Sequence, residues 1–228
     1  MSVPQLPLAL RYPPDQRLES FVDAPEGVIA HLHALAQVQG ADWLYLAGAT
    51  GTGKTHLALA LCAATEAAGR RAAYLPMIAA SGRLRHALEA LEGNDVVALD
   101  GLEAIAGVRD DEVALFDFHN RARSAGLNVL YTARAAPDAL GLDLPDLRSR
   151  VSQCIRVALP TPDDESRREI LRDRAQRRGL VLEDAAVDWL LTRTDRDLGS
   201  LVLLLDRLDR ESLAAQRRIT VPFLKQVI

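Results

Sequence analysis

The sequence predicts an α/β fold in which a five-stranded parallel sheet is followed by a small all-helical lid domain. Three observations predict it. Short apolar runs alternate with helix-like segments over residues 43–160, a glycine-rich loop joins the first of these runs to a helix, and the chain is helix-like from residue 161 onwards. The expected domains are an extended tail at 1–17, the α/β domain at 18–160 and the helical lid domain at 161–228.

The composition favours a soluble core-forming protein and disfavours several classes of function. Hydrophobic residues make up 49% of the 228 positions, enough to bury a core of Leu, Ala and Val. The net charge of -4 argues against direct sequence-specific binding of DNA, which needs a basic face. With neither a signal peptide nor a bilayer-spanning run, we expect a cytoplasmic protein that does not contact membranes. Cys62 and Cys154 are expected to be small core residues rather than a disulfide.

The tail contains one motif that could bind a partner. Residues 5–10 read QLPLAL, and Leu6, Leu8 and Leu10 could enter apolar clefts on another protein while the amide of Gln5 forms hydrogen bonds there. Taken alone, the segment could equally be an inert disordered end.

Periodicity places the elements of both domains. A helix with one buried face is expected over 25–39, and a second over 110–125. After the prolines at 160 and 162, an arginine-rich helix is expected over 162–178; we interpret it as a solvated or subunit-facing helix rather than a DNA-binding one. Strands are expected at 43–47, 72–76, 95–99, 128–132 and 154–159.

Residues 48–55, GATGTGKT, form the motif that carries most chemistry. Its glycines let backbone N–H groups approach a polyphosphate, and the following helix adds its positive N-terminal end. Lys54 supplies a cation for the β- and γ-phosphates, and the Thr55 hydroxyl is placed to ligate Mg²⁺. The motif therefore indicates a site for ADP or ATP with Mg²⁺. The predicted nucleotide-binding residues in this segment are Gly48, Gly51, Thr52, Gly53, Lys54, Thr55 and His56.

Asp100 ends the third expected strand, and in a parallel sheet that end lies beside the phosphate loop. Its carboxylate could therefore reach the Mg²⁺; the alternative is an Asp that merely opens a turn. Many ATPases place a second acid next, where this chain has Gly101. Glu103 could compensate, although a surface Glu at a helix start is the simpler interpretation. Without a positioned base we expect weak self-hydrolysis.

Arginines follow the last two strands. The segment 132–134 would place a polar group near the γ-phosphate. In the segment 144–151, Arg148 and Arg150 stand two residues apart, so on a helix at most one of them could address a given phosphate. Such an arginine could stabilise transition-state charge on a neighbouring subunit's nucleotide, or be an ordinary solvated side chain.

Four features together resemble the DnaA family of AAA+ ATPases, and the resemblance covers nearly the whole chain. They are the loop at 48–55, Asp100 with Ile-Ala-Gly at 105–107, LPDLRSR at 144–150 and TDRDL at 194–198. Within that family the resemblance is to its regulatory inactivators. We expect no C-terminal DNA-binding domain, because the sequence stops after the lid, and residues 5–10 resemble the peptide by which replication proteins dock on the sliding clamp.

The resemblance implies a regulator that binds the DNA-loaded clamp (the polymerase β subunit), contacts ATP-bound DnaA and stimulates its ATP hydrolysis, so preventing re-initiation. Arg150 matches the family's trans-acting arginine finger, with Arg148 as its rival, and Arg196 matches the lid arginine that senses nucleotide in cis. The family's interfaces imply some self-association. Ala133 stands where the family usually has an acid, which weakens a sensing role for that loop. The alternative function is a free-standing AAA+ ATPase, such as an initiator or a helicase-loader-like remodelling factor.

Overall fold

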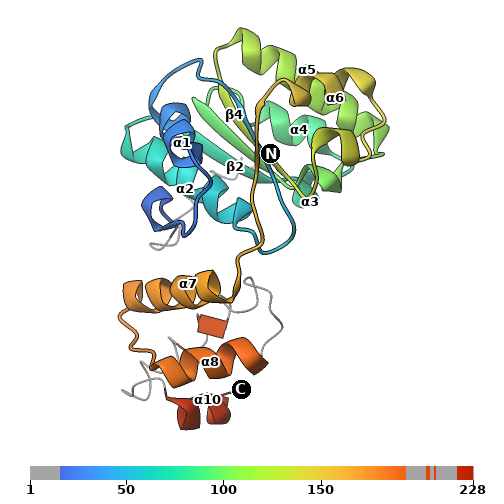
Figure 1. Cartoon of the computed structure of the whole chain (residues 1–228). Helices are drawn as coiled ribbons and strands as arrows, with labels where there is room; N and C mark the ends of the chain where they lie inside the picture. Colours follow the sequence, from blue (N-terminus) through green and yellow to red (C-terminus); the bar gives the residue numbers. More distant parts are fainter. Residues whose placement is uncertain (1–15, 194–203, 206–207, 209–219, 228) are drawn as a thin grey trace, which may run out of the picture.

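The computed structural model describes residues 16–193, 204, 205, 208 and 220–227, and contains a five-stranded, all-parallel sheet (Figure 1). The sheet is ordered β2-β3-β4-β1-β5. The prediction of a five-stranded parallel sheet is confirmed; it did not include a strand order. The strands are β1 (Leu44–Ala47), β2 (Ala72–Pro76), β3 (Val96–Asp100), β4 (Asn128–Ala133) and β5 (Ile155–Ala158). The α-helices packed with it are α1 (Val28–Gln37), α2 (Lys54–Ala67), α3 (Met77–Ala80), α4 (Leu84–Glu89), α5 (Arg109–Ser124) and α6 (Pro145–Ser152). Short 3₁₀ turns are η1 (Leu18–Ser20), η2 (Leu102–Ala104) and η3 (Pro137–Ala139).

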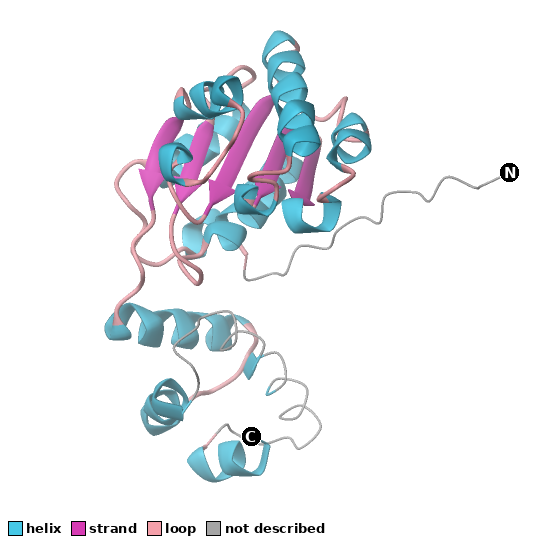
Figure 2. Ribbon diagram, turned by 90° about the vertical axis from the view of Figure 1, so that its right-hand side faces the viewer, coloured by secondary structure: helices cyan, strands magenta, loops and turns pink. Residues whose placement is uncertain are grey.

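The two faces of the sheet bury two separate cores, because successive strand residues point to opposite sides. Trp43 and Tyr45 lie in the core shared with α4, α5 and α6, whereas Leu44 and Leu46 lie in the core shared with α1 and α2. Figures 1 and 2 show these helices covering the sheet on both sides. Cys62 and Cys154 are both buried, one in each core.

The register of the sheet brings the carboxyl ends of its strands to one edge. Asp100 at the end of β3 pairs with Thr132 in β4 and with Pro76 in β2. The loop that leaves β1 begins at the same edge, where the Gly48 N–H donates to the Ala133 carbonyl at 3.1 Å. In parallel sheets this is the edge at which ligands bind.

A second, helical unit follows β5 and has its own core. It contains α7 (Asp164–Arg177), α8 (Asp184–Arg193) and α10 (Val221–Val227), and Leu171, Leu190 and Leu224 are buried together there. The helix expected from residue 162 begins at 164, because Asp163 is its N-cap and accepts a hydrogen bond from the Ser166 N–H at 2.8 Å. No helix within the described ranges is long and apolar enough to cross a bilayer.

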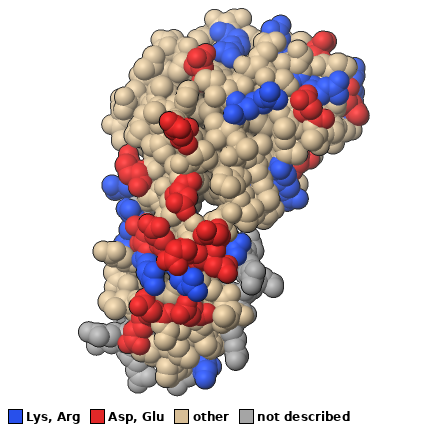
Figure 3. Space-filling view, viewed as in Figure 1, with Lys and Arg blue, Asp and Glu red and all other residues tan. Residues whose placement is uncertain are grey.

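The arginines of α7 lie among acidic side chains of the same unit. Arg168 pairs with Asp188 at 2.9 Å, and Arg172 pairs with Asp184 at 2.8 Å. The space-filling view in Figure 3 shows acidic and basic side chains interspersed over this unit. Such compensated charge fits a solvated helix better than a DNA-binding face.

His119 on α5 gives the fold a specific sensitivity to acid. His119 is 3% exposed, and its ring stacks on that of Tyr131 and meets that of Trp43 edge-on. Burial, together with the charges of Arg123 and Arg150, lowers the pKa of His119 from 6.5 to about 4. Because the unfolded chain binds this proton more readily, stability is lost as pH falls from 6.5 towards 4.

We therefore expect the free energy of unfolding to fall less on acidification in His119→Gln than in the wild type. The difference between pH 7.5 and 4.5 should be about 1–2 kcal/mol, measured by urea unfolding. His86→Gln is the control, since that side chain is 89% exposed. Equal pH dependence of the free energy of unfolding in the two variants would contradict the lowered pKa of His119.

Candidate functional site

The phosphate loop connects β1 to α2, and its glycines are required by both backbone conformation and space. Gly51 and Gly53 have φ angles of 82° and 89°, which side chains disfavour. A Cβ on Gly48 would lie 2.8 Å from the Leu159 carbonyl oxygen, and one on Gly53 would collide with the ring of Phe21. The loop is therefore a compact cradle of backbone groups at the start of a fourteen-residue helix.

Lys54 folds back over this cradle. Its Nζ donates to the carbonyls of Gly48 at 2.6 Å and Ala49 at 2.7 Å. Burial lowers the pKa of Lys54, while the nearby carboxylates of Glu103 and Asp100 oppose that shift. The ammonium group thus lies among the loop carbonyls and the acids at the end of β3.

Asp100 is held by three hydroxyl groups from three elements. Thr55 at the start of α2 and Tyr74 in β2 each donate to its Oδ2 at 2.8 Å, and Thr132 in β4 donates to its Oδ1 at 2.5 Å. Burial and the Asp100 charge raise the pKa of Tyr74, so its phenol remains a donor. The structure thus brings together Thr55 and Asp100, which the sequence singled out as a pair. Tyr74 was missed, because an aromatic residue in a predicted strand reads as core.

The residues after Asp100 form a second polar group at the same rim. Gly101 has a φ of 86° and donates its N–H to Thr132 at 3.0 Å. Glu103 lines the cavity, and it accepts from the Arg134 N–H at 3.0 Å and pairs with the Arg134 Nε at 3.1 Å. The carboxylate of Glu103 is therefore close to the phosphate loop but bound to an arginine.

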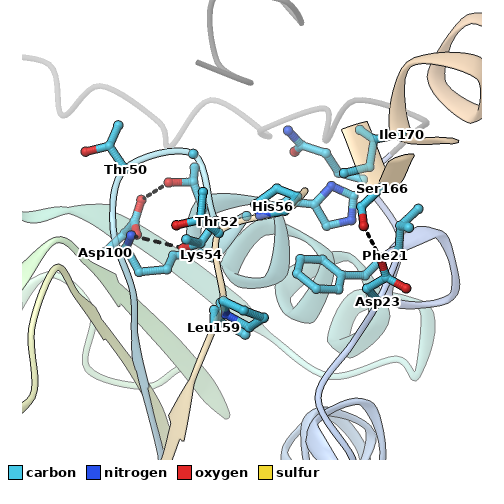
Figure 4. A pocket seen from close by; sticks show the side chains of 18 of the residues that line it. Phe21, Asp23, Thr50, Thr52, Lys54, His56, Asp100, Leu159, Ser166 and Ile170 are labelled. Atoms are coloured by element: carbon cyan, nitrogen blue, oxygen red, sulfur yellow. Dashed lines mark hydrogen bonds between the residues drawn. The ribbon is translucent and has the colours of Figure 1, made fainter. Parts of the chain in front are cut away.

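A cavity of about 1130 Å³ opens between the loop, the segment before α1 and the helical unit. Such a volume is ample for a nucleotide. Phe21 and Leu159 provide apolar lining, and Ile170 on α7 lies across from them (Figure 4). This end of the cavity suits a flat apolar ring, and the other end carries Lys54 and Asp100.

His56 joins the phosphate loop to the helical unit. It is 7% exposed, its Nε2 lies 3.0 Å from the Arg17 carbonyl, and its Nδ1 lies 3.1 Å from a guanidinium nitrogen of Arg174 on α7. A second contact joins the units, where the Ser166 hydroxyl donates to the Asp23 carboxylate (Figure 4). The structure places His56 in the cavity wall facing the lid rather than among the groups around Asp100.

Arg148 and Arg150 lie on α6, and both are exposed. Neither belongs to the cavity lining, so neither addresses this chain's own phosphate loop. Arg150 lies close enough to α5 for its charge to lower the pKa of His119. The predicted lid residue Arg196 and the tail residues Gln5, Leu6, Leu8 and Leu10 lie outside the described residues.

Two family models match the chain. The model described as IstB-like ATP binding protein matches residues 10–135, more than half of the chain. The model described as Hda, lid domain, matches residues 164–228.

Solved structures share the fold. Domain III of the replication initiation protein DnaA from Thermotoga maritima matches with a TM-score of 0.77 at 21% identity, over 95% of this chain and 97% of that chain. AMPPCP-bound DnaA from Aquifex aeolicus matches with a TM-score of 0.66 at 22% identity, over 84% of this chain and 64% of that chain. The Holliday junction branch migration motor RuvB from Thermotoga maritima matches with a TM-score of 0.66 at 21% identity, over 95% and 71%.

The parallel sheet, the phosphate loop and the appended helical unit define a P-loop protein of the AAA+ class. More particularly, the chain belongs to the family of IstB-like ATP binding proteins and, with its Hda lid domain, is a DnaA-like AAA+ protein of the Hda type. The resemblance read from the motifs is thereby confirmed.

Proposed function

We propose that the protein binds an adenine nucleotide, ADP or ATP, with Mg²⁺ at the phosphate loop. The residues present fit both groups. The backbone cradle at 48–53 has no room for side chains at its key glycines, and Lys54 lies beside it. Thr55 and Asp100 place two oxygen ligands of the kind Mg²⁺ prefers within 2.8 Å of each other.

In this proposal each group has a defined task. Lys54 and the loop N–H groups hold the β- and γ-phosphates, while Thr55 and Asp100 hold the metal directly or through water. Tyr74 and Thr132 fix the Asp100 carboxylate. Phe21 lies at the end of the cavity that suits the base. Bound Mg²⁺ would neutralise phosphate charge.

We further propose that the protein regulates replication initiation by stimulating ATP hydrolysis on DnaA. The observation that carries this proposal is the position of Arg150. It is exposed on α6 and outside this chain's own cavity, so any nucleotide that it contacts is held by another subunit. The Hda lid domain supports the same function. The proposal includes association through α6 with DnaA and with further copies of this chain.

Weak hydrolysis by the chain itself fits this role. The position after Asp100 is Gly101, and the nearest alternative base, Glu103, is bound by Arg134. One observation favours the second candidate, a free-standing remodelling ATPase, because Glu103 does line the cavity. Turnover by the chain alone at an ordinary enzyme rate, about 1 s⁻¹ or more, would favour that function.

The clamp-binding part of the proposal concerns residues 5–10. We expect Gln5→Ala to reduce stimulated DnaA hydrolysis about fivefold at limiting protein, because one anchored amide contributes about 1 kcal/mol. The assay contains DnaA, ATP, DNA-loaded clamp and this protein with ADP. Gln37→Ala, at an exposed position of α1, is the control. Full stimulation by Gln5→Ala, or stimulation that does not need the clamp, would contradict tail docking.

A further inference from the structure

Two consecutive carboxylates in the first turn of α5 are buried, although a helix start usually exposes such groups. Asp111 is 3% exposed and Glu112 is fully buried. Acidic residues at this end of a helix are expected for their favourable interaction with the helix dipole. Asp111 and Glu112 also connect α5 to other segments, because each accepts hydrogen bonds from backbone N–H groups of those segments.

Glu112 binds the segment that begins α6. Its Oε1 accepts from the Gly107 N–H at 2.8 Å and the Asp143 N–H at 3.0 Å, and its Oε2 accepts from the Leu144 N–H at 2.6 Å. Leu144 is the N-cap of α6 and has no side chain able to cap a helix. Its carbonyl in turn accepts from the Arg148 N–H at 3.1 Å. One carboxylate therefore fixes the entry to the helix that carries both arginines.

The arginines depend on that helix for their position. Within the described part of the chain, neither guanidinium makes a hydrogen bond or an ion pair with another side chain. Leu147 and Val151 anchor the inner face of α6 in the core. Figure 1 shows α6 beside α5. Apolar contacts of this kind are non-directional, whereas the hydrogen bonds of Glu112 are directional and lie at the end of the helix.

We infer that Glu112 is a positioning residue, which sets the orientation of α6 and so aims its arginines at a partner's nucleotide. The inference rests on the proposed function for the role of the arginines, but not for the geometry of the helix. A displacement of about 1 Å at a transition state can cost a hundredfold in rate, so losing one anchor of α6 should be visible in the stimulated reaction.

Asp111 provides a matched comparison one residue away. Its two oxygens accept from the Gly82 N–H at 2.6 Å and the Leu84 N–H at 3.1 Å, in the turn between α3 and α4. Both carboxylates are buried and both accept hydrogen bonds from backbone N–H groups, but only Glu112 reaches α6. Replacing either carboxylate by its amide turns one acceptor oxygen into a donor that faces a backbone N–H.

The experiment compares Glu112→Gln with Asp111→Asn in the full chain. We expect Glu112→Gln to lower the maximal rate of stimulated DnaA hydrolysis about tenfold or more, while its own affinity for ADP stays within about twofold. Hydrogen exchange should rise at 143–148 in Glu112→Gln and at 82–84 in Asp111→Asn. The maximal rate with Asp111→Asn should stay within about twofold of the wild type.

Equal losses of rate in the two variants, or unchanged exchange at 143–148 in Glu112→Gln, would overturn the inference. Raised exchange at 143–148 with an unchanged maximal rate would also overturn it. If the wild-type protein gives no stimulation of DnaA, the proposed function fails instead, and the exchange data alone decide whether Glu112 positions α6.

Discussion

Replacing Arg150 by alanine is expected to lower the stimulated rate of DnaA ATP hydrolysis at least about a hundredfold, because trans-acting arginines contribute on the order of 10³ to 10⁵ in rate. The affinity of this protein for its own nucleotide should not change, since Arg150 does not line the cavity. The measurement is the maximal DnaA hydrolysis rate at saturating clamp and regulator. The Arg150→Lys variant should have nearly the same low rate as Arg150→Ala, because the point charge of a lysine does not reproduce the planar fork of a guanidinium.

Arg148→Ala is the matched control for this prediction. Both arginines are exposed on the same short helix, two residues apart, and they point in different directions. We expect the Arg148 variant to retain at least about a third of the rate. A large loss with Arg148→Ala and none with Arg150→Ala would move the arginine finger to Arg148. Full activity in both variants would contradict the proposed mechanism.

Replacing Lys54 by alanine is expected to weaken binding of ADP and ATP about a hundredfold. The ammonium lies beside the loop that would cradle the phosphates, and charge-assisted hydrogen bonds contribute about 1.5–3 kcal/mol each. Two such bonds account for about 3 kcal/mol, which corresponds to the expected loss of affinity. Isothermal titration calorimetry with each nucleotide measures it directly.

The sequence supplies a convenient control, because Lys225 is the only other lysine. It is exposed on α10, in the helical unit. Lys225→Ala should bind nucleotide as the wild type does. An unchanged dissociation constant in Lys54→Ala, with far-ultraviolet circular dichroism confirming the fold, would show that the phosphates do not contact this side chain.

Most of the fold could be predicted from local pattern. Each of the five predicted strands overlaps an observed one, because buried parallel strands are short continuous apolar runs between turns. The order β2-β3-β4-β1-β5 could not be read, since it depends on pairing between segments far apart in the chain. The last part of the chain expected to be helix-like, beyond residue 193, lies largely outside the described residues.

The part of the candidate site that lies in one short motif could be predicted from the sequence. The part that the fold assembles from distant segments could not. The loop at 48–55 and Asp100 were found because each residue type has a chemical reason to stand there. Tyr74 and Glu112 were not, because the bonds from Tyr74 to Asp100 and from Glu112 to the start of α6 join residues 26 to 32 positions apart. In the sequence, Tyr74 is interpreted as core and Glu112 as a charge at a helix start. The proximity of Glu103 and Arg134 is likewise a product of the sheet register.

Calorimetric titration of the full-length wild-type protein with ADP and with ATP, each with and without Mg²⁺, tests the central claim most directly. The account predicts one nucleotide per chain with a dissociation constant of about 10 μM or tighter, and tighter binding of ATP when Mg²⁺ is present. Absence of any heat of binding from folded protein under all four conditions would contradict it.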